Sequence, residues 1–298
     1  MASDQPRKRV LVAGATGRLG VIVDVLVERG HSVGAMTRNP TSPAAARVRA
    51  ADADVVYGDF DDPDSIAAAA TGADAMFATG TAHRAGTEGE LRHGRNLAGA
   101  AAAAGVPHLV YSSGDGAAPD SPLPLFRVKH QVEQHIRSLP IAHTILAPVY
   151  FMENLFNPWN RPMLQAGAFP SPVPVELPMQ QVAVADLARL AAMAIERPDE
   201  FAGQRITVAS DELTAEQAAN VLARVLGRDF TAERLASEEL APGLRALFAW
   251  LERNSQNVDL AALRDRYPEV GWHDYEGWLR SQHDRLRELC PREHAGAR

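Results

Sequence analysis

The feature that most constrains this chain is a glycine-rich turn close to its N-terminus. It lies in the segment Arg9-Val10-Leu11-Val12-Ala13-Gly14-Ala15-Thr16-Gly17-Arg18-Leu19-Gly20, where an apolar stretch leads into three glycines with the spacing GxxGxxG. The apolar stretch is typical of a buried strand, and an amphipathic helix is predicted to open at about Leu19. A strand, a glycine turn and a helix N-terminus in this order form the phosphate half of a dinucleotide site.

Each glycine has a distinct predicted role in such a turn. Gly14 permits a tight turn, Gly17 lets the backbone approach a pyrophosphate, and Gly20 lets the helix pack against the strand. The helix N-terminus adds free N–H groups and a partial positive charge. We therefore assign the whole turn to cofactor binding, namely Gly14, Ala15, Thr16, Gly17, Arg18, Leu19 and Gly20. The alternative is an ordinary tight loop, which the flanking strand and helix disfavour.

The length and charge of the chain limit its fold and its partners. With 298 residues, of which 46% are hydrophobic, it can form one large α/β domain, alone or with a smaller lobe. The formal net charge of -7 gives little support for binding a phosphate backbone, so no nucleic-acid partner is expected. No apolar stretch approaches the roughly 20 residues that span a bilayer, and the first residues do not resemble a signal peptide. We therefore expect a cytoplasmic protein with no membrane partner.

The cysteines and histidines give no reason to expect a metal site. Cys290 is the single cysteine, so neither an internal disulfide nor a cysteine-based metal cluster can form. The histidines lack the spacing with carboxylates or cysteines that metal sites use.

The first half of the sequence alternates short apolar strands with helical segments. After the strand that precedes the glycine turn, strands are predicted at Ser32–Thr37, Asp54–Tyr57, Ala75–Thr79 and His108–Ser112. This alternation predicts an α/β protein with a Rossmann-type, doubly wound parallel sheet. Its ligand crevice is expected at the carboxyl ends of the strands.

The character of the sequence changes after Pro148, where prolines and helical segments become frequent. We expect residues 1–149 to form an NAD(P)-binding core and residues 150–298 to form a smaller, mostly helical lobe that covers the crevice. Strands of this lobe, such as Arg205–Ala209, are expected to return to the main sheet.

The end of the second strand indicates which dinucleotide binds. An NAD site usually has an Asp or Glu there for the ribose 2′-hydroxyl, but this chain has Met36-Thr37-Arg38-Asn39. The Arg38 guanidinium can pair with a 2′-phosphate and stack on adenine, and Arg18 can add a second charge. We therefore expect NADP (NADPH) rather than NAD, with Thr37 and Arg38 in its site. The alternative is that Arg38 is a solvated loop arginine.

The remaining strand ends supply further candidate cofactor-binding residues. Asp59, after the third strand, is expected to face the adenine edge, although an ordinary turn aspartate explains it nearly as well. The full set at these ends is Asp59, Phe60, Thr79, Gly80, Thr81, Ser112, Pro148 and Phe151.

Several motifs resemble the NmrA-like branch of the atypical short-chain dehydrogenase/reductase family. They are the glycine turn, Arg38, Lys129 with Glu133, and the segments 104–113, 144–154, 184–188 and 213–217. The resemblance covers residues 8 to 280 and implies a Rossmann-type NAD(P) domain with a smaller C-terminal lobe. In this family some members reduce quinones, dyes or plant phenolic ethers with NADPH. Others act as redox sensors or as partners of transcription regulators.

The chain departs from the wider family at one catalytic position. Typical short-chain dehydrogenases carry Tyr-x-x-x-Lys, in which the tyrosine transfers the proton. Here Leu125 stands four residues before Lys129, so that tyrosine is missing. The resemblance implies that the lysine acts alone in a different proton-transfer arrangement, as in other NmrA-like reductases.

Three residues are candidate catalytic groups, and each has a structural alternative. Lys129 is expected to bind the nicotinamide ribose and to assist protonation, but it could instead be an exposed helix lysine paired with Glu133. Ser113 could polarise a substrate carbonyl or simply be the polar end of a strand. Tyr150 could stack near the nicotinamide or serve as a substitute acid, and a core tyrosine explains it slightly better.

Two functions from different classes follow. The first is an NADPH-dependent oxidoreductase that transfers hydride to a small-molecule substrate, namely a quinone, a carbonyl compound or a conjugated molecule. The second is a non-catalytic NADP(H) sensor that acts through a protein partner, which the missing tyrosine favours. A sugar-nucleotide epimerase shares the glycine turn but needs the tyrosine. The sequence predicts neither the substrate nor the oligomeric state.

Overall fold

The computed structural model describes residues 6–236, 240–254 and 256–290, without the side chains of residues 82–84. The chain forms two compact units. The first unit contains residues 1–148 and 184–208, and the second contains residues 149–183 and 209–298. The segment 184–208 therefore belongs with the N-terminal unit, although it lies in the second half of the sequence.

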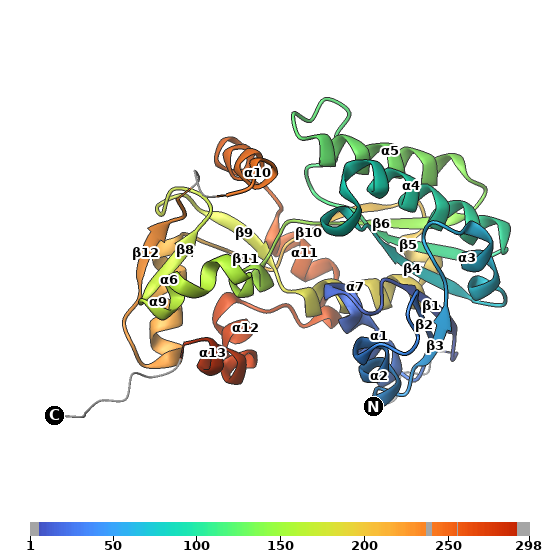
Figure 1. Ribbon diagram of the computed structural model, residues 1–298, viewed down its shortest axis with the longest axis horizontal. Coiled ribbons are helices and arrows are strands. Elements are labelled where there is room, and N and C mark those ends of the chain that lie inside the picture. The colour runs from blue at the N-terminus through green and yellow to red at the C-terminus, as the bar shows by residue number, and fades with distance from the viewer. Residues whose placement is uncertain (1–5, 237–239, 255, 291–298) are drawn as a thin grey trace. The chain divides into compact units, whose positions relative to one another are not determined.

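A seven-stranded parallel sheet forms the centre of the first unit (Figure 1). Its spatial order is β10-β6-β5-β4-β1-β2-β3, so the direction of winding reverses between β1 and β4. This order confirms the predicted Rossmann-type sheet and places the switch point beside the glycine turn. The strands are β1 (Arg9–Ala13), β2 (Ser32–Thr37), β3 (Asp54–Tyr57), β4 (Ala75–Thr79), β5 (His108–Ser112), β6 (Ala142–Pro148) and β10 (Arg205–Val208).

Helices cover both faces of this sheet (Figure 1). One face carries α1 (Val21–Glu28), α2 (Pro43–Ala50) and α7 (Val184–Glu196), and a short helix α8 (Pro198–Phe201) follows α7. The other face carries α3 (Pro63–Ala70), α4 (Ala82–Ala103) and α5 (Pro124–Ser138). The helical geometry of α4 is interrupted at Gly86, whose φ is 66°.

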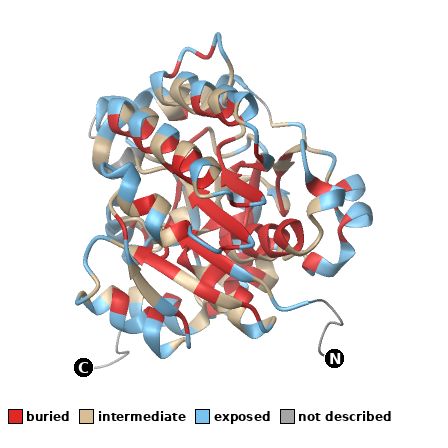
Figure 2. Ribbon diagram, turned by 90° about the vertical axis from the view of Figure 1, so that its right-hand side faces the viewer, coloured by how far each residue is buried: buried red, intermediate tan, exposed pale blue. Residues whose placement is uncertain are grey.

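The strands bury side chains on both faces, as parallel strands between two helical layers must. In β1, Leu11 and Ala13 pack in one cluster with α3, α4 and α5, while Val10 and Val12 point to the opposite face and are 0% exposed. The buried residues accordingly follow the central strands and the inner faces of the helices (Figure 2). Burial on both faces explains why the strand segments of the sequence are almost continuously apolar.

Local signals in the sequence set the ends of several helices. Asp62 caps α3 by accepting a hydrogen bond from the Ser65 N–H, and Pro63 occupies the first helical position. In the second unit, Thr214 and Gln217 form a capping box at the start of α9, and Gly227 ends that helix in the left-handed conformation.

The second unit combines helices with two small sheets. The three-stranded sheet contains β7 (Tyr150–Phe151), β9 (Met179–Val182) and β11 (Asp211–Leu213). The two-stranded sheet pairs β8 (Ala168–Ser171) with β12 (Thr231–Arg234). The helices are α6 (Arg161–Gln165), α9 (Ala215–Leu226), α10 (Pro242–Arg253), α11 (Leu260–Arg266), α12 (Tyr275–Ser281) and α13 (His283–Leu289), with 3-10 turns at Met152–Phe156, Pro158–Asn160 and Pro268–Val270.

The core of the second unit forms around α9. The aromatic rings of Tyr275 and Trp278 pack 5.5 Å apart, and both side chains are almost completely buried. The Trp278 indole N–H donates to Glu153, so its polar atom is satisfied inside the core.

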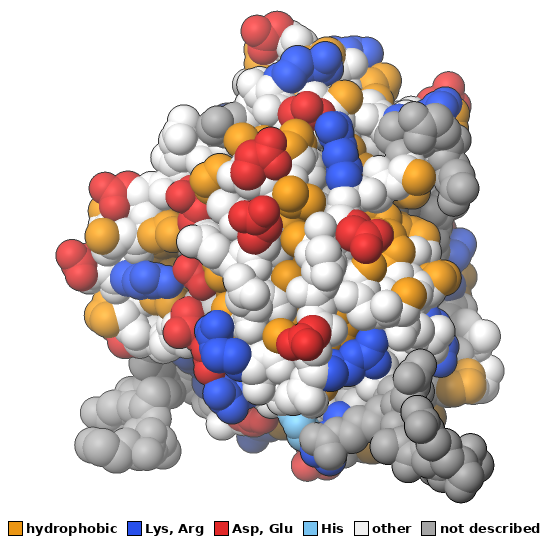
Figure 3. Space-filling model, turned by 90° about the vertical axis from the view of Figure 1, so that its left-hand side faces the viewer, with side chains coloured by type: hydrophobic (Ala, Val, Ile, Leu, Met, Phe, Trp, Pro, Cys, Tyr) orange, Lys and Arg blue, Asp and Glu red, His pale blue; other side chains and the backbone are white. Residues whose placement is uncertain are grey.

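The surface shows no segregation of charge on the face seen in Figure 3. Acidic, basic and apolar side chains are interspersed there. Among the described residues, none of the helices has the length and apolar character that crossing a membrane requires.

His108 is a buried histidine at the start of β5. It is 2% exposed, and its Nε2 lies 2.9 Å from the Thr144 hydroxyl oxygen, which itself donates to the Phe201 carbonyl. Burial, with smaller contributions from Lys8 and His143, lowers its pKa from 6.5 to about 4.

This low pKa predicts a loss of stability in mild acid. The unfolded chain binds a proton at His108 near pH 6.5, whereas the folded chain does so only near pH 4. Stability therefore falls as the pH drops through this window, by about 3 kcal/mol from this residue. Urea unfolding of the wild type and His108→Leu across these pH values measures the difference. An equal acid-induced loss in both proteins would contradict the prediction.

Candidate functional site

The glycine turn between β1 and α1 leaves no room for side chains at two of its glycines. Gly14 has a φ of 86°, and a β-carbon there would lie 2.8 Å from Thr79 Cγ2. At Gly20 a β-carbon would lie 2.1 Å from the Ala15 carbonyl oxygen, so only glycine lets the helix start against the turn. At Gly17 the distance would be 3.3 Å, to the Gly14 carbonyl oxygen. A 3-10 turn, Arg18–Gly20, leads directly into α1.

Within the turn, Ala15 is buried, Thr16 and Leu19 are half-buried, and Arg18 is exposed. The N-cap residue, Gly17, has no side chain with which to cap the first helical N–H groups. A backbone bare of side chains at a helix start is the geometry that accepts a pyrophosphate. The residues present thus fit a dinucleotide.

Arg38 follows β2 at the same edge of the sheet. It is exposed, and no described residue of the chain accepts a hydrogen bond from it. The neighbouring loop is ordered by its own side chains: Thr37 accepts from the Asn39 N–H, and Asn39 accepts from the Thr41 N–H and hydroxyl. The guanidinium is therefore available to an anion at the end of β2.

Asp59 and Phe60 follow β3. The Asp59 carboxylate accepts the Asp61 N–H at 3.0 Å, which makes it a turn-forming aspartate. The Phe60 ring packs edge-on against His93. These contacts anchor the segment after β3 to α4.

The end of β4 contacts a buried carboxylate that the sequence analysis did not identify. Glu90 of α4 is 0% exposed and accepts the Thr81 N–H on Oε2 and the Lys129 ammonium on Oε1, the latter at 2.7 Å. A β-carbon at residue 80 would lie 1.9 Å from Glu90 Oε1, so Gly80 is what lets the carboxylate reach the strand end.

Lys129 lies on α5 with 13% of its side chain exposed. The alternative interpretation of Lys129 as an exposed lysine paired with Glu133 is wrong, because its partner is Glu90, 39 residues away in sequence. The helix position four residues earlier holds Leu125. Lys129 thus presents an ammonium at the carboxyl edge of the sheet, held by a buried anion.

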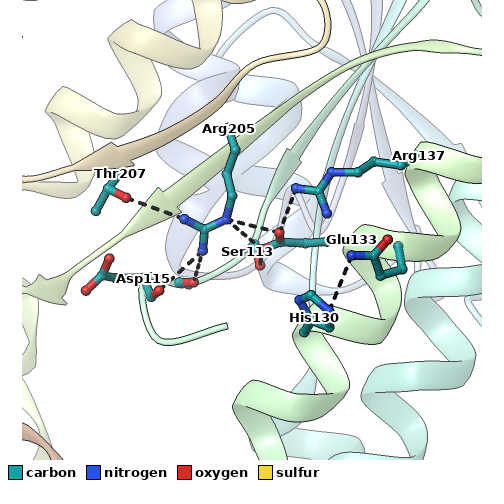
Figure 4. Close-up of polar contacts among 9 residues, drawn as sticks. Ser113, Asp115, His130, Glu133, Arg137, Arg205 and Thr207 are labelled. Atoms are coloured by element: carbon teal, nitrogen blue, oxygen red, sulfur yellow. Dashed lines mark hydrogen bonds and ion pairs between the residues drawn. The ribbon is translucent and has the colours of Figure 1, made fainter. Parts of the chain in front are cut away.

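Glu133 belongs to a second buried cluster (Figure 4). Its carboxylate accepts hydrogen bonds from the Ser113 hydroxyl at 2.6 Å, from Arg205 Nε at 3.0 Å and from Arg137 at 3.1 Å. Arg205 also donates to the carbonyl oxygens of Gly114 and Asp115. The cluster joins α5, the loop after β5 and the returning strand β10.

This cluster bears on the predicted role of Ser113. The residue is 6% exposed, and its single hydroxyl proton points to Glu133. Donation to a substrate carbonyl would require that bond to break. Of the neighbouring candidates, Ser112 is buried at the end of β5, and the Pro148 carbonyl accepts the Asp115 N–H.

A third group of polar side chains runs outward from the end of β4. The Thr81 hydroxyl lies 2.6 Å from His93 Nδ1, and His93 Nε2 lies 3.0 Å from Asp61 Oδ1. Arg92 also donates to Asp61, at 2.7 Å. The hydrogen bond from Arg92 contributes most to holding the pKa of Asp61 below its ordinary value, and His93 acts in the same direction.

Tyr150 and Phe151 lie in the second unit, in β7. Tyr150 lines a small cavity of about 30 Å³ within that unit, together with Asn160, Phe169, Met179 and Tyr275. The catalytic role of Tyr150 and the cofactor role of Phe151 stay predictions.

In the described parts of the chain, no group of three or more His, Cys, Asp or Glu side chains is placed to hold a metal ion.

Sequence reasoning proposed candidates at the carboxyl ends of the strands and did not identify the residues that contact them. Glu90 and His93 stand one helical turn apart on α4, a spacing that puts them on one face, but nothing in the sequence pairs them with Lys129 or Thr81. Arg205 was expected only as part of a returning strand.

The sequence model of the NmrA-like family matches residues 6–253. The chain belongs to the NmrA-like family. An NAD(P)H azoreductase of Xenophilus azovorans is 30% identical over 190 residues, which cover 63% of this chain and 64% of the azoreductase. The chain thus spans less than two thirds of that relative's length.

Two further proteins, one similar in sequence and one similar in structure, match more of the chain. A (4-alkanoyl-5-oxo-2,5-dihydrofuran-3-yl)methyl phosphate reductase of Streptomyces griseus is 30% identical over 241 residues, which cover 80% of this chain and 81% of the reductase. The crystal structure of NmrA, a negative transcriptional regulator, in complex with NADP has a TM-score of 0.78 at 22% identity. The structural match covers 95% of this chain and 98% of the NmrA chain. This NmrA-like chain therefore shares its fold with a regulator and sequence similarity with reductases.

Proposed function

We propose that this NmrA-like protein is an NADPH-dependent reductase that transfers hydride to a quinone, a carbonyl compound or a conjugated small molecule. The observation that carries the proposal is the Lys129 ammonium held by buried Glu90 at the edge where the glycine turn opens. Two relatives whose names state reductase activity, the azoreductase and the furanyl phosphate reductase, support the same reaction class.

The chain's own residues supply binding and orientation. Gly14, Gly17 and Gly20 would hold the pyrophosphate, since the tight turn that brings the backbone to the helix start has no room for β-carbons at Gly14 and Gly20. Lys129 has three N–H donors and uses one on Glu90, which leaves two for ribose hydroxyls or for a developing oxyanion. The bound nicotinamide would supply the hydride.

Arg38 is proposed to select NADPH over NADH. In Arg38→Ala, we expect NADPH to bind about 10–100-fold more weakly, because charged hydrogen bonds contribute about 1.5–3 kcal/mol. NADH binding should change little, since it lacks the 2′-phosphate. Fluorescence titration of both cofactors measures this. Arg49→Ala removes the same charge at the far end of α2 and serves as the control. An equal loss for both cofactors would refute the selective role.

The reductase is tested by following NADPH oxidation with a panel of quinones, aldehydes, conjugated ketones and azo dyes. We expect turnover that prefers NADPH to NADH. Tight binding of NADPH without turnover on any acceptor would reject the enzyme and favour the second candidate.

That second candidate is an NADP(H) sensor that acts through a protein partner. The specific observation in its favour is Leu125, which occupies the helix position of the usual proton-donating tyrosine. The structural similarity of this chain to the regulator NmrA is consistent with the sensor function. Cofactor-dependent capture of a partner, in the absence of turnover, would support it.

A further inference from the structure

A hydroxyl, an imidazole and a carboxylate form a continuous line at the end of β4. Thr81 Oγ1 contacts His93 Nδ1 at 2.6 Å, and His93 Nε2 contacts Asp61 Oδ1 at 3.0 Å. Thr81 is the N-cap of α4, His93 lies in the middle of that helix, and Asp61 lies in the loop between β3 and α3. In hydrolases, the same order of groups moves a proton between a hydroxyl and an imidazole.

The line runs from a half-buried hydroxyl to solvent. Thr81 is half-buried and His93 is 6% exposed, whereas 48% of the Asp61 side chain is exposed. Arg92 and His93 both stabilise the ionised form of Asp61, whose pKa is lowered. An ionised Asp61 accepts the His93 Nε2–H, and in the imidazolium form the Nδ1–H donates to the Thr81 oxygen, which leaves the Thr81 hydroxyl proton for a substrate.

The inner end of the line is tied to Lys129. One oxygen of Glu90 accepts the Lys129 ammonium, and the other accepts the Thr81 backbone N–H. Gly80 allows this carboxylate to lie against the strand end. The Thr81 backbone and the Lys129 ammonium are therefore held by the same buried carboxylate, although they lie 48 residues apart in the sequence.

We propose that Thr81, His93 and Asp61 form a proton relay that completes the reduction in place of the missing tyrosine. The inference rests on the proposed reductase function. After hydride reaches the substrate carbon, the Thr81 hydroxyl gives its proton to the resulting substrate anion. The His93 imidazolium replaces that proton through Nδ1 and becomes neutral, keeping Nε2–H on Asp61. Solvent then returns one proton to Nδ1 and re-forms the imidazolium, while Asp61 still holds Nε2–H, so the net reaction consumes one hydride and one proton.

The test compares Thr81→Val, Thr81→Ser and His93→Gln with the wild type. In Thr81→Val and His93→Gln, we expect kcat, measured at saturating NADPH, to fall by about 10²-fold or more. Proton transfer then limits turnover, so the solvent isotope effect rises and the effect of deuterated NADPH falls. Thr81→Ser keeps the hydroxyl and should retain most of the rate. Glu88→Gln changes an exposed residue of the same helix and is the control.

A measurement without cofactor tests the same contacts directly. In protein with ¹⁵N-labelled histidine, Thr81→Val should shift the Nδ1 resonance of His93, and Thr81→Ser should restore it. Lower rates with unchanged isotope effects would overturn the relay and indicate a structural role. Full turnover in Thr81→Val would also overturn it while leaving the reductase standing. No turnover by the wild type on any acceptor would overturn the reductase and the relay together.

Discussion

Lys129→Met is expected to reduce NADPH-dependent turnover by about 10²–10⁴-fold, the contribution typical of a group that assists proton transfer. It should also destabilise the fold by about 3–5 kcal/mol, because it leaves the charge of a buried ion pair without its partner. That partner, Glu90, is 0% exposed. NADPH oxidation and urea unfolding, measured on the same preparation, give the two effects separately.

A double variant distinguishes catalysis from folding at this position. Glu90→Gln combined with Lys129→Met removes both charges and keeps an amide oxygen for the Thr81 N–H. We expect its stability to return to within about 1–2 kcal/mol of the wild type, because no unpaired charge remains. Turnover should stay low. Recovery of turnover together with stability would show that Lys129 only supports the fold.

Glu133→Ala is expected to destabilise the first unit by about 3–5 kcal/mol, because it strips three donors of their buried acceptor. The carboxylate is 1% exposed and bonds Ser113, Arg137 and Arg205. Through Arg205 it holds β10 at the edge of the sheet (Figure 4).

Equilibrium urea unfolding measures this effect, with Gln134→Ala as the matched control. Gln134 is the next residue on α5, is exposed, and contacts only His130 among the interactions of the described residues. Its replacement should cost less than about 0.5 kcal/mol. If Glu133→Ala costs as little as the control, the cluster is not the structural anchor that its geometry indicates.

The elements that depend on local sequence were predicted closely. The strands at Ser32–Thr37, Asp54–Tyr57, Ala75–Thr79 and His108–Ser112 have the bounds that the apolar runs indicated. Apolar runs of this length, separated by helical segments, leave few alternatives to a parallel sheet between two helical layers.

The candidate site was predicted only in part. Lys129 was proposed as a site residue, with a pairing to Glu133, four residues along the helix, as the alternative; in the structure its partner is Glu90. Neither the Thr81–His93–Asp61 line nor the Glu133–Arg205 pair leaves a periodic signal in the sequence, because their members are 12, 32 and 72 residues apart.

The sequence by itself determined the Rossmann-type sheet, the position of the glycine turn and the arginine at the end of β2, because each depends on neighbouring residues or on a fixed short spacing. Only the tertiary structure decided which buried charges meet. Glu90 reaches Lys129 because α4 and α5 pack side by side on one face of the sheet and Gly80 opens the space for its carboxylate. Arg205 reaches Glu133 because β10 returns to pair with β6. Contacts between distant segments exist only once the sheet has assembled, and here they hold the polar groups at its carboxyl edge.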